Sequence, residues 1–452
     1  MCLLFYLNRD KELTADLLFK MISSFRTDVQ PKLERYKDYY DGIQKILQKS
    51  YSDETKPCSR VVTNYCKNVV DSYVGYLATP GHISYRSDKD IEEIMEVLRY
   101  NDYQAEDTDL LLDALVYGIA CELMYIDEES KTRFRLINPT TCFGICDDTL
   151  TGDLMYFVRM YKESDWDDSD VYNVDVYSDA TVKHYKMQGM GGMPVLVGEE
   201  QHYFSQCPAN IFALPDEKSI FDCVMSLQDA ANELLSSEID DFSAFCDAYL
   251  ALVGVDADDE DVMRMKQNRV LLLPDGSTAS WLTKSASDAQ VENMLNRIQA
   301  SIYRIACCPD FSSESFVGGV SSGIAIKYRL TGMETRAAKV CAAMKKALQR
   351  RIEIISGIAT LKLGEEVFKD IEIEFKRNIP EDISSTVNLV NSLKGTVSDA
   401  TLLGQIPFVT DVNAELEALN EQKQANMDMY GFGLMQTDSV DEDDDEDFED
   451  EE

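Results

Sequence analysis

One stretch of the sequence could bind phosphate groups, because it is rich in glycine and precedes an expected helix. It reads Val317-Gly318-Gly319-Val320-Ser321-Ser322-Gly323. Free N–H groups at the start of a helix attract anions, so such a run can hold a nucleotide. A nucleotide-binding P-loop ends in Gly-Lys followed by Ser or Thr, whereas Ile324 and Ala325 follow here. The sequence therefore favours a flexible loop over a nucleotide site.

Cysteine and histidine spacing gives little support for metal or catalytic chemistry. Cys142 and Cys146 are four residues apart and Cys307 adjoins Cys308, but no second pair completes a zinc site. The three histidines belong to no metal or triad motif. The 12 cysteines are expected to be free, mostly buried thiols in a reducing cytoplasm. Acidic pairs carry little information in so acidic a chain, so we predict no enzyme, metal or cofactor.

A basic stretch is the main charge feature. Residues 327–351 contain a single acid, Glu334, and eight basic residues: Lys327, Arg329, Arg336, Lys339, Lys345, Lys346, Arg350 and Arg351. Such a helix in an acidic chain requires an anionic partner. The partner is either an acidic surface of the same fold or of a neighbouring copy, or a phosphate backbone.

The chain as a whole is strongly acidic. It has 82 Asp and Glu against 43 Lys and Arg, and a formal net charge of -39. Residues 438–452 hold twelve acids and no base, so the remaining chain carries -39 + 12 = -27. This balance argues against a protein that coats nucleic acid. The segment 431–452 is expected to be a disordered acidic tail. No apolar run suits a signal peptide or a membrane span, so we expect a soluble chain.

The elements that position these residues follow from hydrophobic periodicity. Spacings of three and four predict helices, and short β-type runs between turns predict a β-rich region over 119–215. A long helix is expected from Ser219, as its cap, to about Leu252. Strands are expected at 270–273, 279–282 and 371–377. The other predicted helices span 12–50, 60–78, 90–118, 287–306, 323–358, 381–394, 398–403 and 411–427. The predicted fold class is α+β, mainly helical.

The order of several short motifs resembles a known family. Pro309-Asp310, followed about a dozen residues later by Ser322-Gly323-Ile324-Ala325-Ile326-Lys327, is the most specific of them. The motifs before it are Trp281-Leu282-Thr283-Lys284, Val291-Glu292-Asn293 and Ile302-Tyr303. The motifs after it are Phe375 to Pro380, Ser398, Thr401, Pro407, Asp411 and Glu415. The N-terminal part matches more loosely, through Tyr40-Asp41-Gly42, Asn64, Val69-Val70 and Gly75-Tyr76. Together they resemble the portal proteins of siphophages that infect Gram-positive bacteria.

The resemblance implies a portal fold with wing, stem helices, clip, tunnel loop and crown, in a homo-oligomeric ring of about twelve copies. It assigns 1–218 to the wing, 219–252 and 287–306 to the stem, 253–286 to the clip and 307–322 to the tunnel loop. It also assigns 323–380 to a spine helix and wing strand, 381–430 to the crown, and leaves 431–452 as the tail. The tail matches no motif of the family.

The resemblance also implies site residues. Those of the tunnel loop facing DNA are Ser312, Ser313, Ser315, Gly318, Gly319 and Ser321; the loop has no Lys or Arg, which argues against a gripping role. Those contacting DNA or another subunit are Lys327, Arg329, Arg336 and Lys339. Those of the clip that dock the motor and adaptor are Asp258, Glu260, Arg264, Lys266, Arg269 and Asp275.

The implied function is that of a structural subunit of the capsid vertex, through which double-stranded viral DNA is packaged and ejected. Its expected partners are the terminase large subunit, a head-completion adaptor, and the major capsid and scaffold proteins, with no membrane. The protein is expected in the virion after synthesis in the bacterial cytoplasm. Two alternatives stay open: an acidic scaffold or assembly chaperone for capsid proteins, and a nucleotide-dependent DNA-processing enzyme.

Overall fold

The computed structural model describes most of the chain in two units. The described residues are 4–52, 56–79, 81–162, 170–189, 191–245, 249–253, 276, 278–282, 288–311, 323–363, 370–378, 390–404, and several between 406 and 422. The first unit comprises 1–319 and 328–378, and the second 320–327 and 379–452. None of the described helices is both long and apolar enough to cross a membrane.

Five helices and a π-helical turn form the N-terminal part of the first unit. α1 (Ala15–Ser24) continues through a π-helical turn (Phe25–Val29) into α2 (Gln30–Asp41); α3 is Tyr65–Leu77, α4 is Glu92–Tyr100 and α5 is Tyr103–Tyr117. The predicted helical regions are confirmed. α5 ends at Gly118, which has φ +84°. A Cβ there would lie 2.6 Å from the backbone of Lys218, so only glycine fits.

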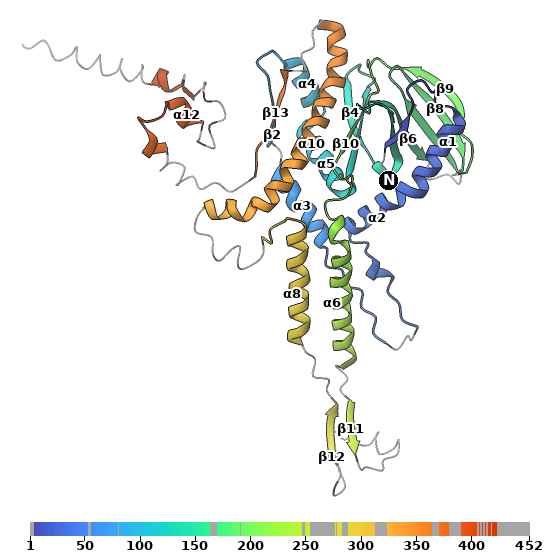
Figure 1. Ribbon diagram of the computed structural model, residues 1–452, viewed down its shortest axis with the longest axis vertical. Helices are drawn as coiled ribbons and strands as arrows, with labels where there is room; N and C mark the ends of the chain where they lie inside the picture. Colours follow the sequence, from blue (N-terminus) through green and yellow to red (C-terminus); the bar gives the residue numbers. More distant parts are fainter. Residues whose placement is uncertain are drawn as a thin grey trace, which may run out of the picture. The chain divides into compact units, whose positions relative to one another are not determined.

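The β-rich region predicted over 119–215 is confirmed as two sheets (Figure 1). The six-stranded sheet has the order β1-β5-β6-β7-β8-β9 and the three-stranded sheet β10-β3-β4. The strands are β1 (Leu4–Leu7), β3 (Ile119–Ile126), β4 (Thr132–Ile137), β5 (Cys142–Asp147), β6 (Leu154–Lys162), β7 (Val171–Tyr177), β8 (Thr181–Gln188), β9 (Val195–Gln201) and β10 (Ala209–Ala213). β1, which the sequence did not predict, pairs in parallel with β5. Phe25 packs on Phe143 of β5 with ring centroids 5.3 Å apart, which fixes the N-terminal helices on this sheet.

The helix predicted over 219–252 is shorter than expected. A 3-10 turn (Asp222–Val224) precedes α6 (Met225–Phe245), and Tyr249–Val253 forms the strand β11. β11 pairs antiparallel with β12 (Thr278–Leu282), which confirms the strand expected at 279–282. The prediction to Leu252 was wrong because a partner strand far along the chain overrides local periodicity. Ser219 does not cap the helix, because the residue that precedes the 3-10 turn is Phe221; the Oγ of Ser219 donates to the carbonyl of Leu115 at 3.1 Å. The strand expected at 270–273 lies outside the described residues.

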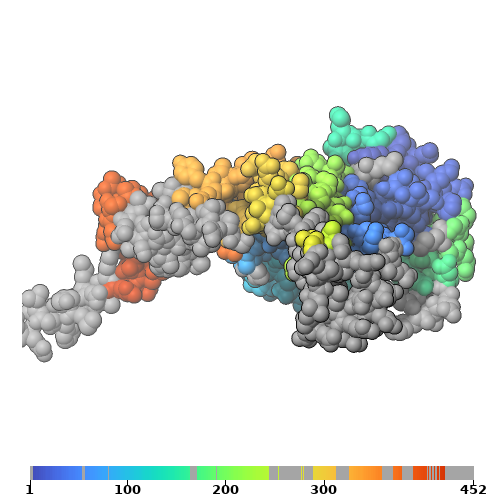
Figure 2. All heavy atoms as spheres, turned by 90° about the horizontal axis from the view of Figure 1, so that it is seen from below, coloured from blue at the N-terminus to red at the C-terminus, as the bar shows by residue number. Residues whose placement is uncertain are grey.

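Two long helices follow. α8 (Asp288–Ile305) matches the prediction, and α10 (Gly323–Leu363) extends past residue 358 to a length of ~60 Å. β13 (Glu372–Phe375), within the strand expected at 371–377, pairs antiparallel with β2 (Ile83–Arg86). In both views α6 and α8 lie side by side (Figures 1 and 2).

The second unit contains α12 (Asp399–Leu403), capped by Ser398, whose Oγ accepts from the Thr401 amide at 3.4 Å. This confirms the helix expected at 398–403. Of the helix expected at 381–394, residues 390–393 are described and helical. Of that expected at 411–427, the described residues between 412 and 422 are helical. The acidic tail lies outside the described residues.

Candidate functional site

The α6–α8 pair leaves large apolar side chains uncovered. Phe242 on α6 is 73% exposed, and Met294 and Ile305 on α8 are 56% and 46% exposed. On the same helices, Leu295 and Ile298 are half-buried and Ile302 is buried. One copy of the chain therefore covers only part of the apolar surface of its paired helices.

The β11–β12 hairpin follows the end of α6 along the chain. Tyr249 pairs with Leu282 and Val253 with Thr278, and Val253 is 63% exposed. In the described part of the chain no third strand joins this pair. A lone two-stranded hairpin is marginal in water, so it too favours assembly with further chains.

The buried face of α6 is polar, contrary to the apolar stripe that the sequence suggested. Gln228, Asn232 and Ser236 have no exposed surface, and Asp240 is 7% exposed. Each follows the previous one by four residues, so the four side chains form a row along one face of the helix. A row of buried polar groups is stable only if hydrogen bonds satisfy it.

An extended segment, residues 59–65, supplies those bonds. The amides of Tyr65 and Thr63 donate to Gln228 Oε1 at 3.0 Å and Asn232 Oδ1 at 2.9 Å. Further along, the amide of Val61 donates to Ser236 Oγ at 3.0 Å, and that of Ser59 donates to Asp240 Oδ1. Four residues of a helix rise by ~6 Å and two residues of an extended chain by ~7 Å. Every fourth side chain of α6 can therefore meet every second amide of the segment. The side chains of α6 thus accept the backbone N–H groups of this segment, as the carbonyl groups of a neighbouring strand would do in a sheet.

α2 and the segment after it hold the same helix. Tyr39 donates to Asp229 Oδ1 at 2.7 Å, and burial together with this bond raises the pKa of Tyr39 to about 12. Lys49 Nζ lies 3.3 Å from both Glu233 and Asp240. These bonds join α6 to α2 and to the segment that follows it.

Replacing Asn232 with leucine tests this row. The variant keeps the volume of the side chain but leaves the Thr63 amide without its acceptor, and each buried unpaired group costs roughly 1–3 kcal/mol. We expect the free energy of unfolding to fall by about 2–3 kcal/mol. Hydrogen exchange should also accelerate at Val61 and Thr63.

The exposed Asn296 on α8 provides the matched control, since Asn296→Leu removes no bond of this row. Equal losses of stability in the two variants would show that the row does not hold the segment.

α10 is anchored through a buried charge cluster. Arg351 has no exposed surface and forms ion pairs with Asp107 of α5 and Glu122 of β3. Its guanidinium lies 4.5 Å from the centre of the Phe134 ring. Tyr85 donates to Asp107 Oδ2 at 2.8 Å, and Arg351 Nε donates to Glu122 Oε2 at 3.1 Å. One arginine therefore connects α10 with α5, with the neighbouring strands β3 and β4 of the three-stranded sheet and, through Asp107, with Tyr85 of β2.

A second cluster holds the segment after β13 on α10. Arg377 Nε and Nη2 donate to Glu334 Oε1 at 3.1 and 3.0 Å. Tyr76 of α3 donates to the other oxygen of Glu334 at 2.6 Å. Burial alone would raise the pKa of Glu334. The bonds from Arg377 and Tyr76 outweigh this effect, so the pKa is lowered. Glu334, the only acid of the basic stretch, thus has a structural partner.

The structure describes only some of the site residues predicted from the sequence. The tunnel-loop residues Ser312, Ser313, Ser315, Gly318, Gly319 and Ser321 lie outside the described residues, as do the clip residues Asp258, Glu260, Arg264, Lys266, Arg269 and Asp275. At the start of the loop, Asp310 Oδ2 accepts from Gln299 of α8 at 3.1 Å. This bond fixes Asp310 against the last turns of the helix.

The basic residues predicted to contact DNA or another subunit are all described. Lys327, Arg329 and Lys339 are exposed on α10. Arg336 is half-buried and donates to the carbonyls of Ile220 at 2.8 Å and Ala306 at 3.2 Å. Arg336 therefore holds α10 against the end of α8 and against the segment that precedes α6. The sequence did not suggest this role.

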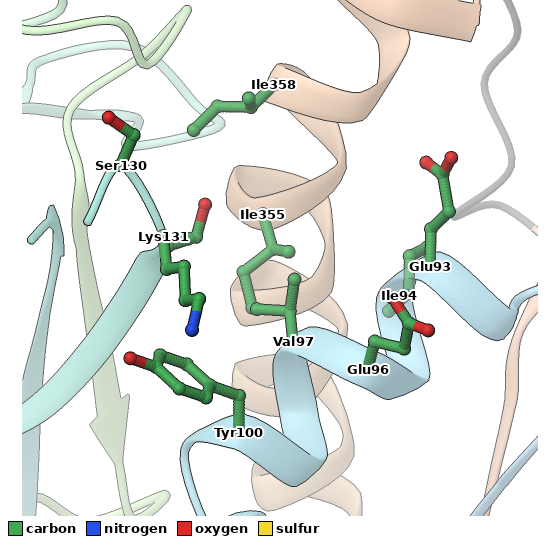
Figure 3. Close-up of a pocket in the computed structure, with 10 residues that line it drawn as sticks. Glu93, Ile94, Glu96, Val97, Tyr100, Ser130, Lys131, Ile355 and Ile358 are labelled. Carbon is green, nitrogen blue, oxygen red and sulfur yellow. The ribbon is translucent and has the colours of Figure 1, made fainter.

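Several hollows lie on the surface of the first unit. Figure 3 shows one of about 430 Å³, with Ile355 and Ile358 of α10 at its floor and Glu93, Glu96 and Lys131 at its rim. Among the described residues no group of three His, Cys, Asp or Glu could hold a metal ion. The ten described cysteines are free thiols, and six of the seven buried ones have a pKa raised by burial or by a neighbouring thiol.

Comparisons with known proteins agree with this architecture. The sequence matches the family described as "Phage portal protein, SPP1 Gp6-like" over residues 26–429. It is similar to the portal protein of Bacillus phage SPP1, with 23% identity over 437 residues, which cover 92% of this chain and 85% of the relative. The resemblance found in the sequence motifs is confirmed. The chain therefore belongs to the SPP1 Gp6-like family of phage portal proteins and is a structural portal subunit.

Proposed function

We propose that the chain assembles into a closed ring of about twelve copies, through which double-stranded viral DNA enters and leaves the capsid. The observation that carries this proposal is the α6–α8 pair, whose residues Phe242, Met294 and Ile305 are exposed in a single copy. A cyclic arrangement covers such a face in every copy, because each subunit meets the next through the same contact. The match to the portal family over 26–429 supports the same reading.

The parts of the proposed subunit follow the described elements. α6 and α8 are the stem, and the clip begins with β11 at Tyr249 rather than at residue 253. α10 is the spine helix, β13 the wing strand, and the sheets with α1–α5 the wing. The tunnel loop at 307–322 and the crown at 381–430 complete the subunit.

The proposed partners follow from the surfaces. The clip, with its incomplete hairpin, docks the terminase large subunit during packaging and a head-completion adaptor afterwards. The major capsid and scaffold proteins surround the wing at the capsid vertex of the virion. The chain is made in the host bacterial cytoplasm, where its free cysteines stay reduced.

Charge supports passage of DNA without tight binding. The chain carries a formal charge of -39, so most of its surface repels phosphate groups. The small uncharged residues of the tunnel loop, such as Ser313 and Gly318, suit light contact with DNA. Transient contact with DNA is proposed for Lys327 and Arg329, which are exposed on α10. Portal proteins are structural, so ATP hydrolysis is assigned to the terminase; an acidic chaperone is not favoured by the family match.

Native mass spectrometry and electron cryomicroscopy of the purified full-length protein test the proposal. We expect a discrete ring of about a dozen copies with a central channel, and α6 and α8 against their counterparts in adjacent copies. A chain that stays monomeric with its scaffold protein present, or a compact oligomer without a channel, would contradict the proposal.

A further inference from the structure

A hollow beside α10 has an unusual charge for this protein. Its volume is about 740 Å³, and Lys339, Lys346 and Arg350 line it from α10. The opposite wall includes Ala209 and Ala213 of β10. We call this hollow the α10 groove. No Asp or Glu is among the described residues that line it.

The cations of the basic stretch divide into two groups. Arg351 is buried in its ion cluster, and Arg350 donates to Gln206 at 2.6 Å and to Glu353 at 2.9 Å. Lys339 and Lys346 are exposed and form no ion pair with any residue that the structure describes. Two lysines thus face the α10 groove with their charges uncompensated.

The floor of the α10 groove limits what can enter it. Ala342 and Ala343 lie between the two lysines along the helix and Ala347 follows Lys346, and these small side chains leave room close to the backbone. Lys339 and Lys346 are separated by two helical turns, about 10 Å. This spacing suits carboxylates carried on an extended peptide. A DNA duplex binds through many phosphate contacts at once, and two lysines in a confined hollow provide few.

We propose that the α10 groove binds a carboxylate-bearing segment of the neighbouring copy in the ring. The inference rests on the proposed ring. Without the tail each chain carries a formal charge of -27, so adjacent copies repel each other unless cations of one meet acids of the next. Lys339 and Lys346 are exposed cations that the α10 groove offers for this contact.

Zero-length cross-linking of isotope-mixed rings tests the contact. Rings are assembled from equal amounts of ¹⁵N-labelled and unlabelled full-length protein, purified by size, and treated with a carbodiimide that joins lysine directly to Asp or Glu. We expect peptides in which Lys339 or Lys346 of one isotope is joined to an acid of the other. Cross-links of these lysines only within one isotope, or none at all, overturn the inference and leave the ring intact. Chains that form no rings contradict both proposals.

A double variant measures the contribution of the two lysines. Lys339→Gln with Lys346→Gln should raise the protein concentration at which half of the copies are in rings by about tenfold, because two charge-assisted contacts are lost. The control is Lys20→Gln with Lys183→Gln, on α1 and β8 outside the groove. An equal effect of both double variants overturns the inference. So does a short DNA duplex that abolishes the cross-links and whose binding requires Lys339 and Lys346, since the ligand is then phosphate.

Discussion

Replacing Arg351 with methionine is expected to lower the free energy of unfolding by about 3–5 kcal/mol, the usual cost of breaking a buried ion pair from one side. Asp107 and Glu122 would remain, with exposures of 1% and 0%, and neither could reach water. Methionine fills much of the volume of the arginine, so the loss reports on charge rather than on a cavity. Chemical denaturation of the full-length protein measures the effect.

The dependence of this loss on pH provides a separate check. Burial raises the pKa of Asp107 even with Arg351 present, and without the arginine only the bond from Tyr85 opposes this effect. A carboxyl whose pKa is higher in the folded than in the unfolded state favours folding at low pH and loses that contribution as pH rises. The Arg351→Met variant should therefore be less destabilised, relative to the wild type, near pH 5 than near pH 8.

Two further variants make the test specific to the cluster. Arg350→Met removes the adjacent, half-buried arginine and should cost no more than about 1 kcal/mol. Adding Asp107→Asn and Glu122→Gln to Arg351→Met should recover part of the loss, because neutral amides are cheaper to bury than charges. If the arginines at 350 and 351 prove equally important, the buried cluster does not anchor α10.

Periodicity predicted most of the fold because most elements satisfy it locally. α3 and α5 bury the apolar positions that recur every three or four residues, and the strands between 119 and 215 alternate with clear turns. The end of α6 could not be predicted in this way. Tyr249–Val253 continues the helical spacing, but its pairing with Thr278–Leu282 is a contact between segments about thirty residues apart. Such pairing is invisible to a local pattern.

The anchorage of the long helices was harder to predict than their extent. Arg351 looks like one more base in a basic stretch, and its partners Asp107 and Glu122 lie more than 200 residues away. The polar row of α6 did leave a signal, since Gln228, Asn232, Ser236 and Asp240 recur every four residues. That spacing is usually typical of a solvated face. Here the face is buried because residues 59–65 lie on it, which the sequence alone does not show.

The polar row lies on the buried side of α6 while Phe242 of the same helix is exposed, and this leads to the second large effect. Replacing Phe242 and Met294 with aspartate should abolish rings, because assembly would then bury two charges in apolar contacts. The same change should barely affect folding of one copy, since these side chains are already 73% and 56% exposed in it. Sedimentation velocity measures the ring, and thermal unfolding monitored by circular dichroism measures the fold.

Leu150 supplies the control, because it is fully exposed and lies between β5 and β6, away from α6 and α8. Leu150→Asp should leave rings unchanged. The half-buried Leu295 and Ile298 are less suitable targets for the main test, although aspartate at both should also abolish rings. Charges there would disturb the packing of α6 on α8 within one copy, and loss of rings would follow from misfolding alone. Rings of unchanged mass in the Phe242→Asp, Met294→Asp variant would mean that neighbouring copies do not meet through these helices. The stem assignment would then fail, while membership of the portal family would stand.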